Sequence, residues 1–333
     1  MSRLLDAKPN VNEDLDTTLR PKYLKEYVGQ ADLKKNLEVF IGAAKHREEP
    51  LDHILFYGPP GLGKTTLAYV IANEMGANIH VISGPSIEKT GDLAIALSEI
   101  ECGDILFIDE IHRMPKVAQE ALYSAMEDFC FNVNVSRETG TRIINMKIPP
   151  FTVIGATTRA GDLSAPLRAR FGYTEKLNFY TTEEIQKIVM RSARVFKIDI
   201  AKDAALEIAK RSRGTPRIAN RLFKRVRDFA NYEGKDIVDI NIANTSLKAL
   251  KVDPIGLDDV DIRYLKTMIE RFSGGPVGLE TLANAIGEEL QNLEDVYEPY
   301  LLQIGFINRT PRGRAATDLA YKHLKIAHQG LLF

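Results

Sequence analysis

The segment Gly58-Pro-Pro-Gly-Leu-Gly-Lys-Thr65 has the residue types and the spacing of a phosphate-binding P-loop. Gly61 and Gly63 allow backbone N–H groups to turn inward around phosphate oxygens. Lys64 can neutralise the β- and γ-phosphates of a nucleotide, and the Thr65 hydroxyl can bind Mg²⁺. Every fixed position of the motif is filled, so the segment predicts a nucleotide site.

Two acids, Asp109 and Glu110, directly follow the apolar run at 104–108. A carboxylate at such a strand end faces the P-loop, so we expect Asp109 to hold Mg²⁺ through water and Glu110 to act as the general base that polarises the attacking water. Thr157 and Thr158 end a later apolar run and can orient that water or contact the γ-phosphate. Taken alone, the two threonines are equally well explained as ordinary strand-end hydroxyls.

Short apolar runs at 53–57, 104–108 and 151–154 predict buried parallel strands. Helical stretches separate them, which indicates a doubly wound α/β core. A helix expected from 65 to 75 turns its N-terminus toward the phosphates and brings Thr66 near the α-phosphate. Beyond residue 181 the pattern becomes purely helical, and the last part of the chain combines helices with a hairpin.

The 333 residues and 44% hydrophobic content predict two or three domains. A net charge of -1 means that any nucleic acid must be bound by local basic surfaces. Cys102 and Cys130 form no CxxC pair, which argues against a disulfide framework or a zinc site. We find neither a signal peptide nor a long apolar span, and expect a cytoplasmic protein.

Motifs along nearly the whole chain resemble those of AAA+ ATPases. The P-loop is followed by DEIH at 109–112, GATTRA at 155–160 and RGTPR at 213–217. Longer strings, FIDEIHRM, GATTRAGDLSAPLRARFG, RGTPRIANRL and RTPRGRAAT, are similar to those of the motors that branch-migrate Holliday junctions. The resemblance implies an AAA+ P-loop core, an all-helical lid and a C-terminal winged helix, with bounds that we expect at 1–180, 181–253 and 254–333.

The same resemblance implies roles for residues that the sequence alone does not single out. Arg170, just before Phe171-Gly172, matches the finger that reaches the neighbouring subunit's ATP in trans and stabilises charge on the transferring phosphoryl group. Arg217 matches a sensor that contacts the γ-phosphate in cis. Further matches to residues near the nucleotide are Leu19, Arg20, Glu127, Asp128, Phe129 and Tyr180.

Residues 131–148 alternate apolar and polar side chains around Gly140, which predicts a β-hairpin. The resemblance implies that this hairpin contacts a junction-binding protein of the RuvA type, and Ile144 and Met146 would be its anchors. A hairpin packed on its own core is the alternative.

The tail from 301 to 333 carries five arginines and lysines against a single acid, Asp318. Arg309 and Arg314 match DNA contacts of the family, and Arg312 is a third candidate. Arginines on a wing can follow the phosphates of double-stranded DNA without reading its sequence, although a solvated basic wing is the alternative. At Leu290, where some relatives carry a basic residue, the chain departs from the family pattern.

Together these features predict an ATP- and Mg²⁺-dependent DNA motor. The resemblance implies a homohexameric ring that acts on Holliday junctions in recombination and repair, with a RuvA-like partner and a RuvC-like resolvase. A clamp-loader subunit or an origin-binding switch would share the finger region but hydrolyse ATP rarely. A protein-remodelling ATPase would need no basic wing.

Overall fold

The computed structural model describes residues 18–137 and 140–327, without the side chains of 132–144. The chain divides into two compact units. The first comprises Met1–Gly58 and Leu62–Asn178, and the second comprises Pro59–Gly61 and Phe179–Phe333. The tip of the P-loop therefore groups with the second unit. Within 18–137 and 140–327, no helix is long and apolar enough to cross a membrane.

The first unit is built on a parallel sheet of order β2-β3-β6-β1-β7. Its strands are β1 (Ile54–Tyr57), β2 (Ile79–Ser83), β3 (Ile105–Asp109), β6 (Thr152–Thr157) and β7 (Tyr173–Lys176). The three central strands are the apolar runs expected from the sequence, and their side chains are almost entirely buried. The edge strands β2 and β7 were not predicted, because each is only half-buried and polar residues interrupt its apolar pattern.

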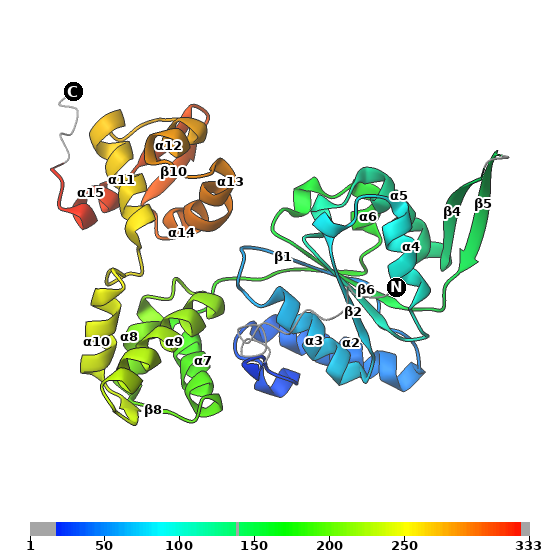
Figure 1. The fold of residues 1–333 in the computed structure, drawn as a ribbon, viewed down its shortest axis with the longest axis horizontal. Helices are drawn as coiled ribbons and strands as arrows, with labels where there is room; N and C mark the ends of the chain where they lie inside the picture. Colours follow the sequence, from blue (N-terminus) through cyan, green and yellow to red (C-terminus); the bar gives the residue numbers. More distant parts are fainter. Residues whose placement is uncertain (1–17, 138–139, 328–333) are drawn as a thin grey trace, which may run out of the picture. The chain divides into compact units, whose positions relative to one another are not determined.

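Helices cover both faces of this sheet, with α2 and α3 on one side and α4, α5 and α6 on the other (Figure 1). The helical segments are η1 (Leu24–Glu26), α2 (Ala31–Arg47), α3 (Lys64–Met75), η2 (Gly84–Ser86), α4 (Thr90–Ser98), η3 (Ile111–Arg113), α5 (Lys116–Asp128), η4 (Ala160–Asp162) and α6 (Ala165–Ala169). In α2 the buried stripe is Leu33, Leu37, Ile41 and Ala44. Phe40 lies off that stripe, where it is exposed and contacts the Tyr173 ring.

Strands β4 (Cys130–Arg137) and β5 (Gly140–Lys147) form the expected antiparallel hairpin. It extends away from the body of the first unit (Figure 1). Phe131 and Ile148, at its base, are buried in the core that lies under α4 and α5.

The lid half of the second unit contains α7 (Thr182–Val195), β8 (Asp199–Ile200), α8 (Lys202–Lys210), α9 (Pro216–Tyr232), β9 (Ile237–Val238) and α10 (Ile240–Ala249). Caps fix two helix starts: Thr181 forms a capping box with Glu184 at α7, and the Asp239 carboxylate accepts from the Ile242 N–H at α10. The short parallel pair β8–β9 has only two residues per strand, too few for a sequence pattern.

The winged-helix half contains α11 (Asp259–Phe272), α12 (Leu279–Ile286), α13 (Leu290–Asn292), η5 (Leu293–Tyr297), α14 (Glu298–Gln303), β10 (Ile307–Thr310), β11 (Gly313–Ala316) and α15 (Asp318–Leu324). The helical stretch 290–303 is not one regular α-helix, because the π-turn η5 precedes α14. The antiparallel wing β10–β11 sets Arg309 directly opposite Arg314.

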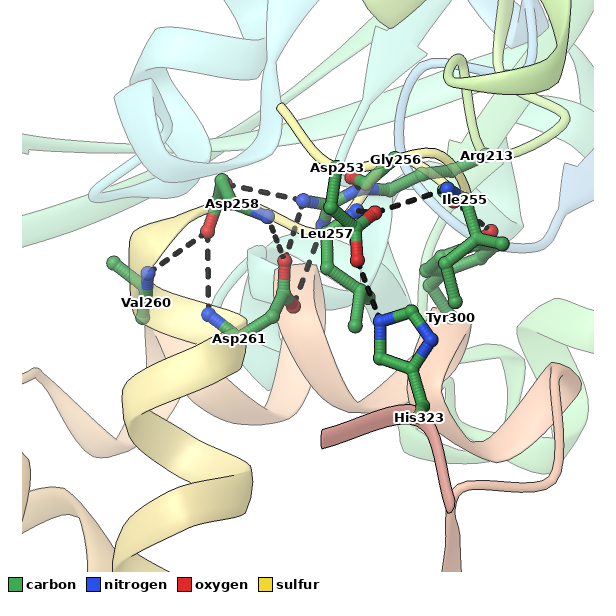
Figure 2. A network of polar contacts seen from close by, with 10 residues as sticks. All are labelled: Arg213, Asp253, Ile255, Gly256, Leu257, Asp258, Val260, Asp261, Tyr300 and His323. Atoms are coloured by element: carbon green, nitrogen blue, oxygen red, sulfur yellow. Dashed lines mark hydrogen bonds and ion pairs between the residues drawn. The ribbon is translucent and has the colours of Figure 1, made fainter. Parts of the chain in front are cut away.

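A polar network joins the lid to the winged helix within the second unit (Figure 2). Arg213 donates from Nε to the Gly256 carbonyl at 2.6 Å and from Nη2 to Oδ2 of the fully buried Asp261 at 2.5 Å. Asp253 accepts from two backbone N–H groups of the connecting segment, and its Oδ2 lies 2.7 Å from His323 Nε2. The connection between the two halves is thus held by charge-assisted contacts, of which the Arg213–Asp261 pair is buried.

Candidate active site

The P-loop connects β1 to α3 and closes tightly on itself. Gly58 has φ +135°, and a Cβ there would lie 2.8 Å from the Leu177 carbonyl oxygen, so the position accepts only glycine. Lys64 is the first residue of α3, and its side chain is only 7% exposed. Its Nζ donates to the Gly58 carbonyl at 2.8 Å, which holds the ammonium group inside the loop. A cation beside the N-terminus of α3 makes this loop suited to bind phosphate.

Thr65 and Asp109 meet where α3 begins and β3 ends. The Thr65 hydroxyl lies 3.5 Å from Asp109 Oδ2, while Oδ1 accepts the Glu110 N–H at 3.0 Å. A hydroxyl and a carboxylate are the hard oxygen ligands that Mg²⁺ takes, with water and phosphate completing its octahedron. The donor set at this sheet edge therefore fits a magnesium ion.

Glu110 stands next to Asp109 in a left-handed backbone conformation, with φ 49°. Thr158 donates its hydroxyl to Glu110 Oε2 at 3.3 Å. His112 Nδ1 lies 3.3 Å from the same oxygen and 2.8 Å from the Thr157 hydroxyl. Burial lowers the pKa of His112 despite the nearby Glu110 charge, so its imidazole is neutral at pH 7. The structure thus brings together the expected base and both expected threonines.

Arg170 lies at the end of α6, where it faces α5. Its Nη2 donates to the Tyr123 hydroxyl at 3.1 Å, its guanidinium stacks over that ring at 4.9 Å, and it forms an ion pair with Glu127. The family-implied residues Arg170 and Glu127 therefore share one surface. Asp128 is exposed beside them, and Phe129 turns toward Phe151 with a ring separation of 6.1 Å.

The residues expected around the adenine of the nucleotide are divided between the two units. In the first unit Leu19 is buried, and Arg20 lies over the Tyr69 ring at 5.0 Å. In the second unit Tyr180 is buried and its N–H donates to the Gly214 carbonyl at 2.9 Å. Arg217 follows Pro216 at the start of α9, and its N–H lies 3.4 Å from the Gly61 carbonyl oxygen of the same unit.

Two of the three candidate wing arginines are paired with a buried acid. Arg309 and Arg314 both donate to Glu298, whose carboxylate is fully buried. Arg312 is exposed at the turn between β10 and β11, where its N–H donates to the Thr310 hydroxyl.

The two anchors expected on the β4–β5 hairpin differ in what can be said of them. Met146 packs partly against the core of the first unit. Ile144 pairs with Val133 through the backbone, and its side chain lies outside the described part of the structure.

Comparison with known proteins covers the chain in three consecutive parts. Residues 19–177 match the P-loop domain model of the Holliday junction DNA helicase RuvB, 180–253 match the RuvB AAA lid domain, and 254–325 match the RuvB C-terminal winged helix domain. The chain belongs to the RuvB family. It is therefore an AAA+ ATPase whose first domain binds nucleotide, as the motifs predicted.

Individual RuvB proteins resemble the chain over almost its full length. The Holliday junction branch migration complex subunit RuvB of Oenococcus oeni is 57% identical over 328 residues, which span 98% of this chain and 97% of that protein. The solved Thermotoga maritima RuvB Holliday junction branch migration motor superposes with a TM-score of 0.85 at 52% identity and covers 93% of this chain and 99% of its own. An R170A variant of that RuvB gives the same TM-score.

Three residues near the sites of this RuvB-family chain were missed by sequence reasoning. His112 lies inside the DEIH motif, and its spacing from Glu110 was the one available signal. Gly84 is required because a Cβ there would lie 2.3 Å from the Glu110 carbonyl oxygen. Glu298 resembles an ordinary helix-start acid, and only the fold reveals its contacts with Arg309 and Arg314.

Proposed function

We propose that this chain is an ATP-driven DNA motor that branch-migrates Holliday junctions, together with a RuvA-type partner, in recombination and repair. The observation that carries the proposal is the meeting of Thr65, Asp109 and Glu110 at one sheet edge beside the buried Lys64. That hydrolytic constellation occurs in a chain whose lid and winged helix also match RuvB models. A protein-remodelling ATPase would have no need of the wing.

The nucleotide is ATP, bound with Mg²⁺. The loop backbone at Gly61 and Gly63 surrounds its phosphates, Lys64 neutralises them, and Thr66 contacts the α-phosphate. Thr65, and Asp109 through water, would hold a magnesium ion, which would supply positive charge to the phosphates.

Glu110 acts as the general base toward the attacking water. The hydroxyl of Thr158 donates to its carboxylate and holds it in position. The Thr158 hydroxyl also contacts the γ-phosphate when ATP is bound. Since Thr158 contacts the general base Glu110 as well, it links the base to the bound nucleotide.

Other residues complete the site, some from the same subunit and one from its neighbour. Leu19, Arg20 and Tyr180 cover the adenine of the nucleotide, and Arg217 contacts the γ-phosphate in cis. Arg170 acts in trans on the neighbouring subunit's ATP, and its Glu127 and Tyr123 contacts keep the guanidinium in place on the subunit surface. Asp128 and Phe129 belong to the same surface.

The assembly is a homohexameric ring on double-stranded DNA. The divisions 1–180, 181–253 and 254–333 serve as ATPase core, lid and DNA-binding domain, with Arg309, Arg312 and Arg314 on the DNA. Ile144 and Met146 of the β4–β5 hairpin contact the RuvA-like protein, and a RuvC-like resolvase joins the junction complex in the cytoplasm.

The rival function is an assembly factor that uses ATP to switch its binding state. A displacement assay on a linear duplex that carries a bound third strand distinguishes the motor from the assembly factor. With ATP, Mg²⁺ and the RuvA-type partner, a motor displaces the third strand while turning over ATP continuously. About one ATP per loaded ring with the third strand retained would instead support the assembly factor.

A further inference from the structure

The buried carboxylate of Glu298 is the centre of the wing. It begins α14, and its side chain has 0% exposure. Oε1 accepts from the Tyr264 hydroxyl at 2.8 Å and from Arg314 Nε at 2.7 Å. Oε2 accepts from Arg309 at 2.7 Å and 3.2 Å and from Arg314 Nη2 at 3.2 Å. Five donors therefore surround one carboxylate.

These contacts keep Glu298 ionised. Burial by itself would raise the pKa of this carboxyl, but the hydrogen bonds from Arg314, Tyr264 and Arg309 outweigh it and hold the pKa below its usual range. Two guanidinium groups share the Glu298 carboxylate, and the charge of Glu294 also acts on Arg314. Tyr264 stays a neutral donor, because burial and the Glu298 charge both raise its pKa.

The same contacts fix two long side chains that would otherwise be mobile. Arg309 and Arg314 lie opposite each other on strands of only four residues, and an isolated two-stranded hairpin is marginally stable. Glu298 ties both guanidinium groups to the helical part of the domain. Their side chains nevertheless remain 48% and 20% exposed.

The guanidinium groups of Arg309 and Arg314 each carry donors beyond those that contact Glu298. An arginine carries five N–H donors, and the contacts with Glu298 use Nε and Nη2 of both residues. The Nη1 groups are suited to phosphate oxygens, which favour charge-assisted bonds from a fixed planar donor.

We propose that Glu298 is a positioning residue for DNA binding, which holds Arg309 and Arg314 in the orientation that contacts the phosphate backbone. This inference rests on the proposed DNA-binding function of the wing. It assigns a function in DNA affinity to a buried acid that itself touches no DNA.

The charge of Glu298 and its positioning role predict opposite changes in DNA affinity when Glu298 is neutralised. A neutral side chain would make the wing more positive by one charge, and duplex DNA would then bind more tightly with a steeper salt dependence. Positioning predicts weaker binding, because each guanidinium must then be ordered at the moment of contact. Glu298→Gln keeps the shape and separates the two accounts by sign.

The test measures the affinity of the full-length protein for a labelled duplex at several salt concentrations, with a non-hydrolysable ATP analogue. We expect Glu298→Gln to bind about tenfold more weakly, with a log–log salt slope smaller by about 1. Equal or tighter binding overturns the inference. In an Arg309→Ala/Arg314→Ala background, Glu298→Gln should have no further effect, and a full additional loss would also overturn it.

Two controls keep the outcomes distinct. Thermal melting of Glu298→Gln should stay cooperative with a lower midpoint, because a buried ion pair loses one charge, and its DNA-free ATPase should match the wild type. If melting is not cooperative, Tyr264→Phe carries the test, with two- to threefold weaker binding expected and unchanged binding overturning the inference. If the wild-type protein binds no duplex, the proposed function fails. If Arg314→Ala weakens binding but Glu298→Gln does not, only the positioning role fails.

Discussion

The Thr65 hydroxyl lies 3.5 Å from Asp109 Oδ2, although 44 positions separate the two residues in the chain. One belongs to the P-loop helix α3 and the other ends strand β3, so the parallel sheet is what brings them together. This pairing brings two separate sequence motifs together and sets a hydroxyl beside a carboxylate, the type of oxygen donors that Mg²⁺ takes.

Asp109→Asn tests the magnesium role. Because the amide lacks the negative charge that attracts the ion, the Mg²⁺ concentration for half-maximal ATPase should rise about tenfold, equivalent to ~1.4 kcal/mol of lost binding. A magnesium titration at saturating ATP measures it, with the exposed lid residue Asp236→Asn as control. An unchanged titration midpoint would remove Asp109 from the metal site.

Thr158→Val tests how Glu110 is held. Losing the hydroxyl that donates to Glu110 Oε2 should lower kcat about tenfold while KM changes little, because the contact orients the base rather than the substrate. Thr158→Ser, which keeps the hydroxyl, should recover most of the rate. Equal rates for the valine and serine variants would contradict this role.

Arg170 can be tested across subunits by mixing two inactive variants. Arg170→Ala should lose about 10³-fold of the DNA-stimulated ATPase, and Glu110→Gln should also be inactive. In mixed rings the intact Glu110 of one variant can meet the intact Arg170 of the other. ATPase should therefore reappear on mixing, and a mixture as inactive as its components would exclude a finger acting in trans.

Gly84→Ala should displace the general base Glu110, because Gly84 begins the neighbouring helix η2 and lies against the Glu110 backbone. The added methyl would lie 2.3 Å from the Glu110 carbonyl oxygen, so backbone must shift and we expect a stability loss of about 1–3 kcal/mol with a lower kcat. Gly42→Ala is the matched control, because nothing lies within 4 Å of its Cβ in helix α2. Equal melting temperatures and rates for the two variants would refute the close approach.

Asp261 makes the stability of the second unit depend on pH. Burial is the main cause that raises the pKa of this carboxyl to about 7; Arg213 opposes it and Asp258 adds to it. The ordinary value is 3.8, so between pH 4 and 7 the folded state binds the proton more tightly than the unfolded chain. This contribution to stability is full below about pH 4 and is lost as the pH rises through 7.

The difference between wild type and Asp261→Asn isolates that effect. Relative to the variant, the wild-type Tm should fall by about 5–10 °C between pH 5 and pH 8, because roughly two pH units below the folded-state pKa correspond to roughly 2–3 kcal/mol. Comparing the two profiles cancels the contributions of His53 and His112. Their pKa values are lowered in the folded state, so their effect on stability changes with pH in the opposite direction. Parallel profiles would mean that Asp261 stays ionised throughout.

The sequence predicted the features that have a local pattern. The central strands are continuous apolar runs, the P-loop has fixed spacing, and the hairpin alternates, so each could be located without long-range information. Edge strands β2 and β7 escaped because half-exposed strands carry mixed side chains.

What could not be predicted depends on contacts between distant parts of the chain. Glu298 reaches arginines 11 and 16 positions away, and Arg213 reaches Asp261 across 48. The wing arginines were expected to be solvated if they did not bind DNA; instead a buried acid pairs with two of them. Only the packed domain brings these charges together.

The most direct test of the central claim is branch migration on a synthetic four-way junction with ATP, Mg²⁺ and the junction-binding partner. The wild-type protein should separate the junction into duplex products while hydrolysing ATP. Glu110→Gln should bind ATP and the junction yet leave it intact. Rapid ATP hydrolysis by the wild type without any separated junction would contradict the motor, although the ATPase site itself would stand.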